Sequence, residues 1–160
     1  MNTSFLPRLA LATALSLASA SAAVAADRTP SPAGAEVYIV SPKDGAKVSG
    51  PVTVVFGLKG MGIAPAGIKF DNSGHHHLLI DTDSPTDMSL PLPADEHNVH
   101  FGKGQTETTL TLSPGKHTLQ LVFADFLHTP HVPAVISKKV TISLRRSFLR
   151  KTGSSAAFTP

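Results

Sequence analysis

Short runs of β-branched, aromatic and aliphatic residues recur along the chain, and glycine, proline, asparagine and aspartate lie between them. Several runs alternate polar and apolar positions, which is typical of half-buried strands, because successive side chains of a strand point to opposite faces. No apolar period of 3.6 residues recurs after the N-terminal segment, so little helix is expected. The pattern predicts seven strands, at residues 37–40, 52–58, 75–81, 97–101, 106–112, 116–125 and 135–144.

Seven short strands within about 110 residues, each bounded by turn formers, predict an all-β fold, an immunoglobulin-like antiparallel β-sandwich. A small barrel is the alternative. Residues 82–96 contain three prolines and many turn formers. Because proline removes a backbone donor from a sheet, we expect this segment to be a loop that crosses the edge of the sheet.

The first 25 residues have the features of a secretory signal peptide: Arg8, then an apolar run over 9–18, then small residues that end in "AVA". Cleavage is expected after Ala25 or Ala26. The apolar run is shorter than the roughly 20 residues that a membrane-spanning helix needs, so we expect an exported protein, periplasmic or secreted, with no transmembrane segment. The mature protein is then expected to have a linker over 26–35 and one domain over 36–144.

The charge of the chain is unevenly distributed. The total is +3, but residues 35–144 hold 8 lysines, no arginine and 10 acidic residues, a balance of −2. A mildly acidic domain argues against a nucleic-acid partner, which needs clustered lysine and arginine. Four positive charges lie in the tail, 145–160, together with Phe148 and Leu149. We expect this tail to be disordered; weak contact with anionic lipid or cell-wall polymer of the envelope is the alternative.

Cysteine is absent from the chain. Small exported domains often rely on disulfides, so the stability of this one must come from its core, with a bound metal as a further contributor.

All eight histidines lie between His75 and His131, and three are consecutive in "SGHHHLLID". If consecutive strands of the sandwich run in opposite directions, the connections before residue 75, after residue 101 and after residue 125 share one end of the domain. His97, at the start of its strand, is expected slightly further from this end of the domain, and His117 is expected at the opposite end. The predicted topology therefore gathers six histidines at one end: His75, His76, His77, His100, His128 and His131.

His75 and His77 are two positions apart on a strand, so they share a face with Cα atoms about 6.6 Å apart. Two imidazoles at this spacing can converge on one metal with nitrogen–metal bonds of about 2.0–2.1 Å. A third ligand would come from His100 or His128. The predicted metal ligands are His75, His77, His100 and His128, with His76, His97, His131, Met61 and Asp125 as further candidates.

A structural role is the alternative for several of these side chains. His76 shares a face with Leu78 and Ile80, and for it we favour a hydrogen-bonded core histidine. His97 and His131 could be solvated loop residues, and Met61 could be an apolar plug in a glycine-rich loop. For His117, where related sandwiches often have a corner tyrosine, we favour a structural role. Asp125 could be a ligand or an acceptor that orients an imidazole.

Imidazole suits copper, zinc, nickel and iron, and a given nitrogen site binds Cu(II) more tightly than Zn(II), so we favour copper over zinc.

Three functions fit this chemistry. A module that buffers or carries the ion is favoured. A metal-dependent enzyme is less supported, since there is no His-Glu-x-x-His, no Gly-x-Ser-x-Gly and no obvious general base beyond Asp125. A recognition domain that presents its loops to a protein or cell-envelope partner would need no metal.

Five motifs follow one another over residues 52–144: "GMGIAPAG", "GHHHLLID", "HFGKGQTE", "SPGKHTLQL" and "HTPHVPAVIS". Together they resemble the exported bacterial family catalogued as domain of unknown function 4399. The resemblance implies a periplasmic or secreted single domain whose histidines recur in the family motifs, and it implies no activity. Lys103, where the family pattern suggests glycine, and the basic tail depart from it.

Overall fold

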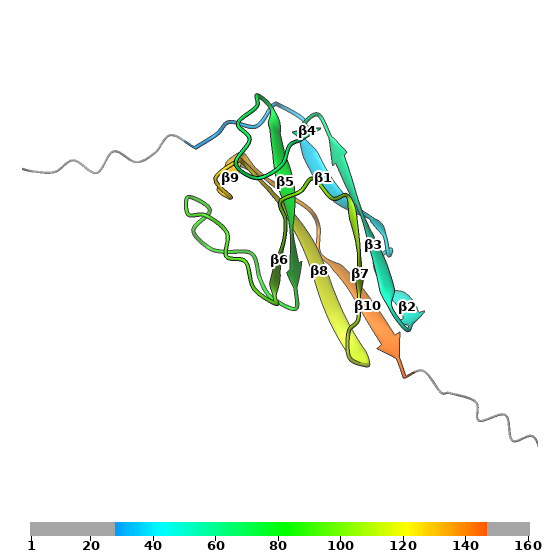
Figure 1. Cartoon of the computed structure of the whole chain (residues 1–160). Helices are drawn as coiled ribbons and strands as arrows, with labels where there is room; N and C mark the ends of the chain where they lie inside the picture. Colours follow the sequence, from blue (N-terminus) through cyan, green and yellow to red (C-terminus); the bar gives the residue numbers. More distant parts are fainter. Residues whose placement is uncertain (1–27, 147–160) are drawn as a thin grey trace, which may run out of the picture.

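The structure, a computed structural model, describes residues 28–146, and these form a two-layered β-sandwich (Figure 1). None of the described residues is helical, and this part of the chain therefore offers no helix able to cross a membrane. The all-β sandwich predicted from the sequence is confirmed. The expected signal peptide, and the expected tail from residue 147 onward, lie outside the described residues.

The smaller sheet has three antiparallel strands in the order β1 (Glu36–Ser41), β3 (Val52–Lys59) and β7 (Glu107–Leu110). The larger sheet is built around the long strand β8, which pairs with β5 on one side and with β9 and β10 on the other. Its seven strands are β2 (Ala46–Ser49), β4 (Gly62–Ile63), β5 (Ser73–Ile80), β6 (Asn98–Phe101), β8 (Gly115–Ala124), β9 (Pro130–Ile136) and β10 (Val140–Arg145).

The structure has ten strands where the pattern predicted seven. Two of the additional strands, β2 and β4, are too short for a period of two to be recognised, and each pairs in parallel, with β10 and β5 respectively. The last expected strand, 135–144, is interrupted at 137–139: its first two residues end β9, which already begins at Pro130, and its later residues belong to β10. The cause lies at Ser137, whose hydroxyl oxygen accepts the Leu121 N–H at 2.8 Å and so takes a place that a backbone carbonyl has in a regular ladder.

The main core lies between the sheets, where alternate residues of β3, β5 and β8 meet. It includes the buried side chains Val54, Phe56, Leu78, Leu121 and Phe123. A second, smaller core lies on the outer face of the larger sheet, beneath the loop over 81–97. Residues 82–96 were expected to form a loop that crosses the edge of the sheet, but Leu92 packs on its outer face. Its buried members are Leu79, Leu92, Val122 and Ala124. Because of this second core, all eight residues of β5 are buried.

The expected linker is not separate from the domain in its described part. Residues 28–32, which we call the N-terminal arm, lie along β9, and Pro30 forms a parallel bridge with Val132. The Ser31 N–H donates to the carbonyl of Val132 at 2.9 Å, and the Val132 N–H donates to the carbonyl of Thr29 at 3.0 Å.

Candidate metal centre

Strand β5 provides two of the four clustered histidines. It runs between β8 and β6, and its alternation directs His76, Leu78 and Ile80 into the main core. His75 and His77 point to the opposite face, together with Leu79 of the second core. Both imidazoles are almost completely buried, at 0% and 1% exposure.

The other two histidines approach the same face from neighbouring elements. His100 on β6 is the register partner of His77, so the two side chains share a face of the sheet. His128 lies in the turn between β8 and β9, has a φ of 66°, and accepts a 2.9 Å hydrogen bond at its carbonyl from the Leu92 N–H. The ring centroids of His100 and His128 are 4.7 Å apart.

Four ring nitrogens, one from each of these side chains, lie within 4.8 Å of one another. His75 Nε2 is 3.2 Å from His77 Nε2 and 3.2 Å from His128 Nδ1. A tetrahedral ion with metal–nitrogen bonds of 2.0–2.1 Å needs its ligand nitrogens about 3.3–3.4 Å apart. The cluster is therefore close to the size that such an ion requires.

Burial favours the neutral form of three of these imidazoles, those of His75, His77 and His100. It lowers the pKa of His75 to about 4 and the pKa of His77 to about 3, with the neighbouring histidines acting in the same direction. The pKa of His100 is also lowered, first by burial and then by His128. Near pH 7 these three rings therefore each have a free lone pair, as a metal ligand must.

The hydrogen-bonding capacity of the cluster is only partly used. Each neutral imidazole has one N–H, and His75 Nε2 faces two other ring nitrogens while offering at most one lone pair or one proton. His75 Nδ1, His77 Nδ1 and His100 Nε2 are buried and have no hydrogen-bond partner. Buried polar atoms without partners cost free energy. A cation at the centre of the cluster would bind the nitrogens that converge there, among them His75 Nε2, His77 Nε2 and His128 Nδ1, in place of their contacts with one another.

Gly102 is a residue of the site that the sequence analysis did not identify. A Cβ atom at this position would lie 2.3 Å from both Cε1 and Nε2 of His100, and 3.1 Å from the Ala66 Cβ. The backbone at Gly102 thus packs directly against the imidazole, and only glycine leaves His100 in its place. The motif "HFGKG" offered a signal, a glycine two positions after a candidate ligand.

His76 and Met61 lie on the interior side of the larger sheet. The His76 ring packs between Phe56 and Phe123, with centroid distances of 5.1 Å to each. Its position in the core agrees with the interpretation that we favoured, but neither ring nitrogen has a hydrogen-bond partner. Met61 packs against the same core.

His131 and His97 lie outside the group of converging nitrogens. His131 is fully buried in β9 rather than solvated, with its ring nitrogens 3.3 Å from the Phe123 carbonyl oxygen and 3.2 Å from the Ser73 carbonyl oxygen. The His97 side chain is about half exposed, and its Nδ1 lies 2.9 Å from the carbonyl oxygen of Ile80.

Asp125 and His117 have structural hydrogen bonds. The Asp125 carboxylate accepts from two backbone N–H groups of the β8–β9 turn and from the Thr29 hydroxyl, and it is not among the converging groups. His117, at the opposite end, contacts Asp81 Oδ2 at 2.7 Å and the Ser113 carbonyl oxygen at 2.8 Å. Burial acts to lower the pKa of His117, but the hydrogen bond with Asp81 raises it above the usual value.

Comparisons with known proteins bear on the fold and the family. No curated protein matches the chain. Among solved structures, the fibronectin(III)-like modules of Clostridium thermocellum CbhA are similar, with 12% sequence identity, a TM-score of 0.41, and coverage of 69% of this chain and 96% of that chain. The family described as "Domain of unknown function (DUF4399)" matches residues 54–145, more than half of the sequence. The chain belongs to this family, as its five motifs predicted.

Proposed function

We propose that this protein is an exported metal-binding module that buffers or carries copper or zinc through His75, His77, His100 and His128. The observation that carries the proposal is the convergence of four imidazole nitrogens, one from each side chain, within 4.8 Å. The four ligands come from two strands and a turn, so the fold itself brings them together.

The energetics of the cluster favour an ion over a purely structural role. Well-packed apolar side chains would fill the same space without burying polar atoms that lack partners. His75 and His77 nevertheless lie directly beside the second apolar core, formed by Leu79 and its neighbours. Without an ion, His75 Nε2 faces two other ring nitrogens at 3.2 Å and can form a hydrogen bond with only one of them.

The donor set narrows the choice of ion. The chain has no thiolate, and the converging group contains no carboxylate, so the site is all nitrogen. Such a set suits Cu(II) and Zn(II), and the usual affinity order favours copper. Burial of His75 and the neighbouring histidines lower the pKa of His75, whereas the Asp125 carboxylate acts to raise it. The negative charge of Asp125 therefore favours a positive charge at this position. Four protein ligands leave no vacant position on a tetrahedral ion, which supports binding or transport over catalysis.

A recognition function is the second candidate, and one observation favours it. Exposed large hydrophobic side chains gather at the histidine end of the domain, in the loops and short strands around the cluster. They are Ile63, Ile68, Phe70, Leu90, Leu127 and Val132. Clustered exposed apolar residues often mark a docking surface. On this hypothesis the melting temperature would respond neither to metal nor to chelator.

The test is a calorimetric titration of the mature chain, purified without a histidine tag, with Cu(II) and with Zn(II). We expect one ion per chain and a Kd below about 1 µM. Replacement of both His75 and His77 by alanine should abolish binding. His97→Ala, which removes a histidine outside the cluster, is the matched control and should bind as the wild type does. Binding weaker than micromolar, or binding that persists in the double variant, would overturn the proposal.

A further inference from the structure

Of the four clustered histidines, only His128 lies outside a strand. Its φ of 66° belongs to the left-handed region, which is uncommon for residues other than glycine, although histidine, asparagine and aspartate adopt it more often than most. The geometry of His75, His77 and His100 is fixed by sheet pairing, whereas that of His128 depends on the hydrogen bonds of the β8–β9 turn. Whatever holds this turn also sets the position of the fourth imidazole.

The turn is held from within by Asp125. Its Oδ1 accepts the N–H of Leu127 at 2.9 Å and the N–H of Thr129 at 3.0 Å, so the carboxylate bonds the backbone on both sides of His128. The His128 N–H donates to the Asp125 carbonyl at 3.0 Å. Asp125 is only 4% exposed, so water cannot easily replace these bonds.

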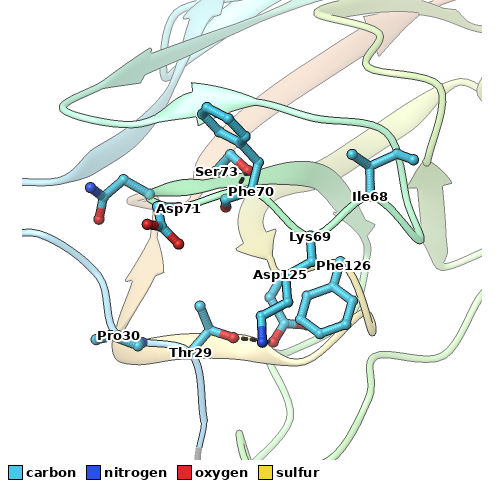
Figure 2. Close-up of a pocket in the computed structure, with 10 residues that line it drawn as sticks. Thr29, Pro30, Ile68, Lys69, Phe70, Asp71, Ser73, Asp125 and Phe126 are labelled. Carbon is cyan, nitrogen blue, oxygen red and sulfur yellow. Dashed lines mark hydrogen bonds between the residues drawn. The ribbon is translucent and has the colours of Figure 1, made fainter.

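Asp125 is itself held by the N-terminal arm, about 100 residues away in the sequence. The Thr29 hydroxyl donates to Asp125 Oδ2 at 2.6 Å, and Figure 2 shows this bond at the edge of a pocket of about 190 Å³ that both residues line. The Arg28 guanidinium donates to the carbonyls of Pro130 and His131, at 2.8–3.2 Å. The arm therefore binds strand β9, which begins two residues after His128.

We propose that Thr29 and Asp125 are positioning residues of the metal site, which act through His128 and do not touch the ion. This inference rests on the proposed function. Thr29 fixes the Asp125 carboxylate, the carboxylate fixes the turn, and the turn aims His128 Nδ1 at His75 Nε2. Cleavage after Ala25 or Ala26, as expected from the sequence, leaves Thr29 close to the new N-terminus. Loss of the first few mature residues would then weaken metal binding.

The first test compares Thr29→Val, which keeps the shape but lacks the hydroxyl, with Thr29→Ser, which retains it. Groups that orient a ligand typically change metal affinity 10–100-fold when removed, so we expect Cu(II) to bind Thr29→Val about 10-fold more weakly. Thr29→Ser should bind within about 2-fold of the wild type. Ser31→Ala is the matched control: it removes the 2.7 Å arm bond from Ser31 Oγ to the Pro133 carbonyl, which does not involve Asp125, and should have no effect.

A double-mutant cycle with His128→Ala identifies the route of the effect. If Thr29 acts through His128, Thr29→Val should add no loss of Cu(II) affinity once His128 is absent. The electron paramagnetic resonance spectrum of copper-loaded Thr29→Val should also shift towards that of His128→Ala, as one nitrogen ligand is loosened. An additive effect, or a spectrum that does not change, would overturn the inference.

Asp125 is tested with Asp125→Asn and Asp125→Ala. The asparagine amide can accept both turn N–H groups and donate to Thr29, so Asp125→Asn should bind copper within a few-fold of the wild type, whereas Asp125→Ala should lose at least 10-fold. Equal losses in the two variants would overturn the positioning role and indicate a carboxylate ligand. If the wild type binds copper and Thr29→Val binds it equally well, this inference fails and the proposed function stands. If the wild type binds no metal, both fail.

Discussion

His76 is a buried imidazole that faces away from the proposed metal site, and its replacement by leucine tests the energetics of the core. The ring is 1% exposed, packs against Phe56 and Phe123, and has no hydrogen-bond partner for either nitrogen. Burial lowers its pKa to about 4; the backbone carbonyl of Gln105 opposes the shift without making a bond of good geometry. Leucine has a similar size and no polar atom, so His76→Leu should stabilise the fold.

The expected magnitude has two parts. A buried polar group without a partner costs about 1–3 kcal/mol of folding free energy. At pH 7 the leucine variant should regain part of this free energy. The second part depends on pH. The pKa of the unfolded imidazole is 6.5 and that of the folded one is about 4, so between these values the unfolded state binds the extra proton. Stability is therefore lost as the pH falls from 6.5 towards 4, by about 2 kcal/mol between pH 7 and pH 5.

Urea unfolding of the wild type and of His76→Leu at pH 7 and pH 5, both with chelator present, measures these terms. The leucine variant should be more stable at pH 7, and its advantage should grow by about 2 kcal/mol at pH 5. Val54→Ala, which creates a cavity without a titratable group, should destabilise equally at both pH values. Copper affinity at pH 7 should be the same in His76→Leu and in the wild type. The same pH dependence of stability in His76→Leu and in the wild type would show that burial of the His76 imidazole does not lower its pKa.

Three further substitutions test other parts of the structure. Gly102→Ala should displace the His100 ring and weaken copper binding at least 10-fold in a titration, with little change in the circular dichroism spectrum. Gly74→Ala would place a Cβ 2.1 Å from a backbone oxygen of β8, and calorimetry should show a loss of about 3 kcal/mol. His117→Phe removes the partner of Asp81. The pKa of His117 is raised and that of Asp81 is lowered, so the pair stabilises the fold most at pH values between these two pKa values. Urea unfolding should therefore show that the substitution lowers the free energy of unfolding more at pH 5.5 than at pH 9.

The fold class could be predicted because strand alternation and turn residues are local signals. The strands that the sequence did not reveal are those that depend on partners far along the chain. Ala46–Ser49 is a strand only because it lies beside β10, and Gly62–Ile63 only because it lies beside the start of β5. Likewise, the break at Ser137 depends on its bond with Leu121, which a single sequence does not encode locally.

The site could be predicted in outline for the same reason. The i, i+2 spacing of His75 and His77, together with the alternating strand directions, was enough to place His100 and His128 beside them. The side chains that support the site could not be predicted. Thr29 lies in a segment with the composition of a linker, and its contact with Asp125 spans 96 residues. His131 is flanked by Pro130 and Val132 in what the pattern presents as a loop, yet it is completely buried.

X-ray absorption spectroscopy of the copper-loaded and zinc-loaded tag-free protein is the decisive measurement for the four-histidine site, because it reports the atoms bound to the ion. We expect four nitrogen ligands at about 2.0 Å, with the outer-shell scattering of imidazole rings and no sulfur. A first shell dominated by oxygen, a sulfur ligand from methionine, or an unchanged spectrum after His75 and His77 are both replaced would contradict the four-histidine site.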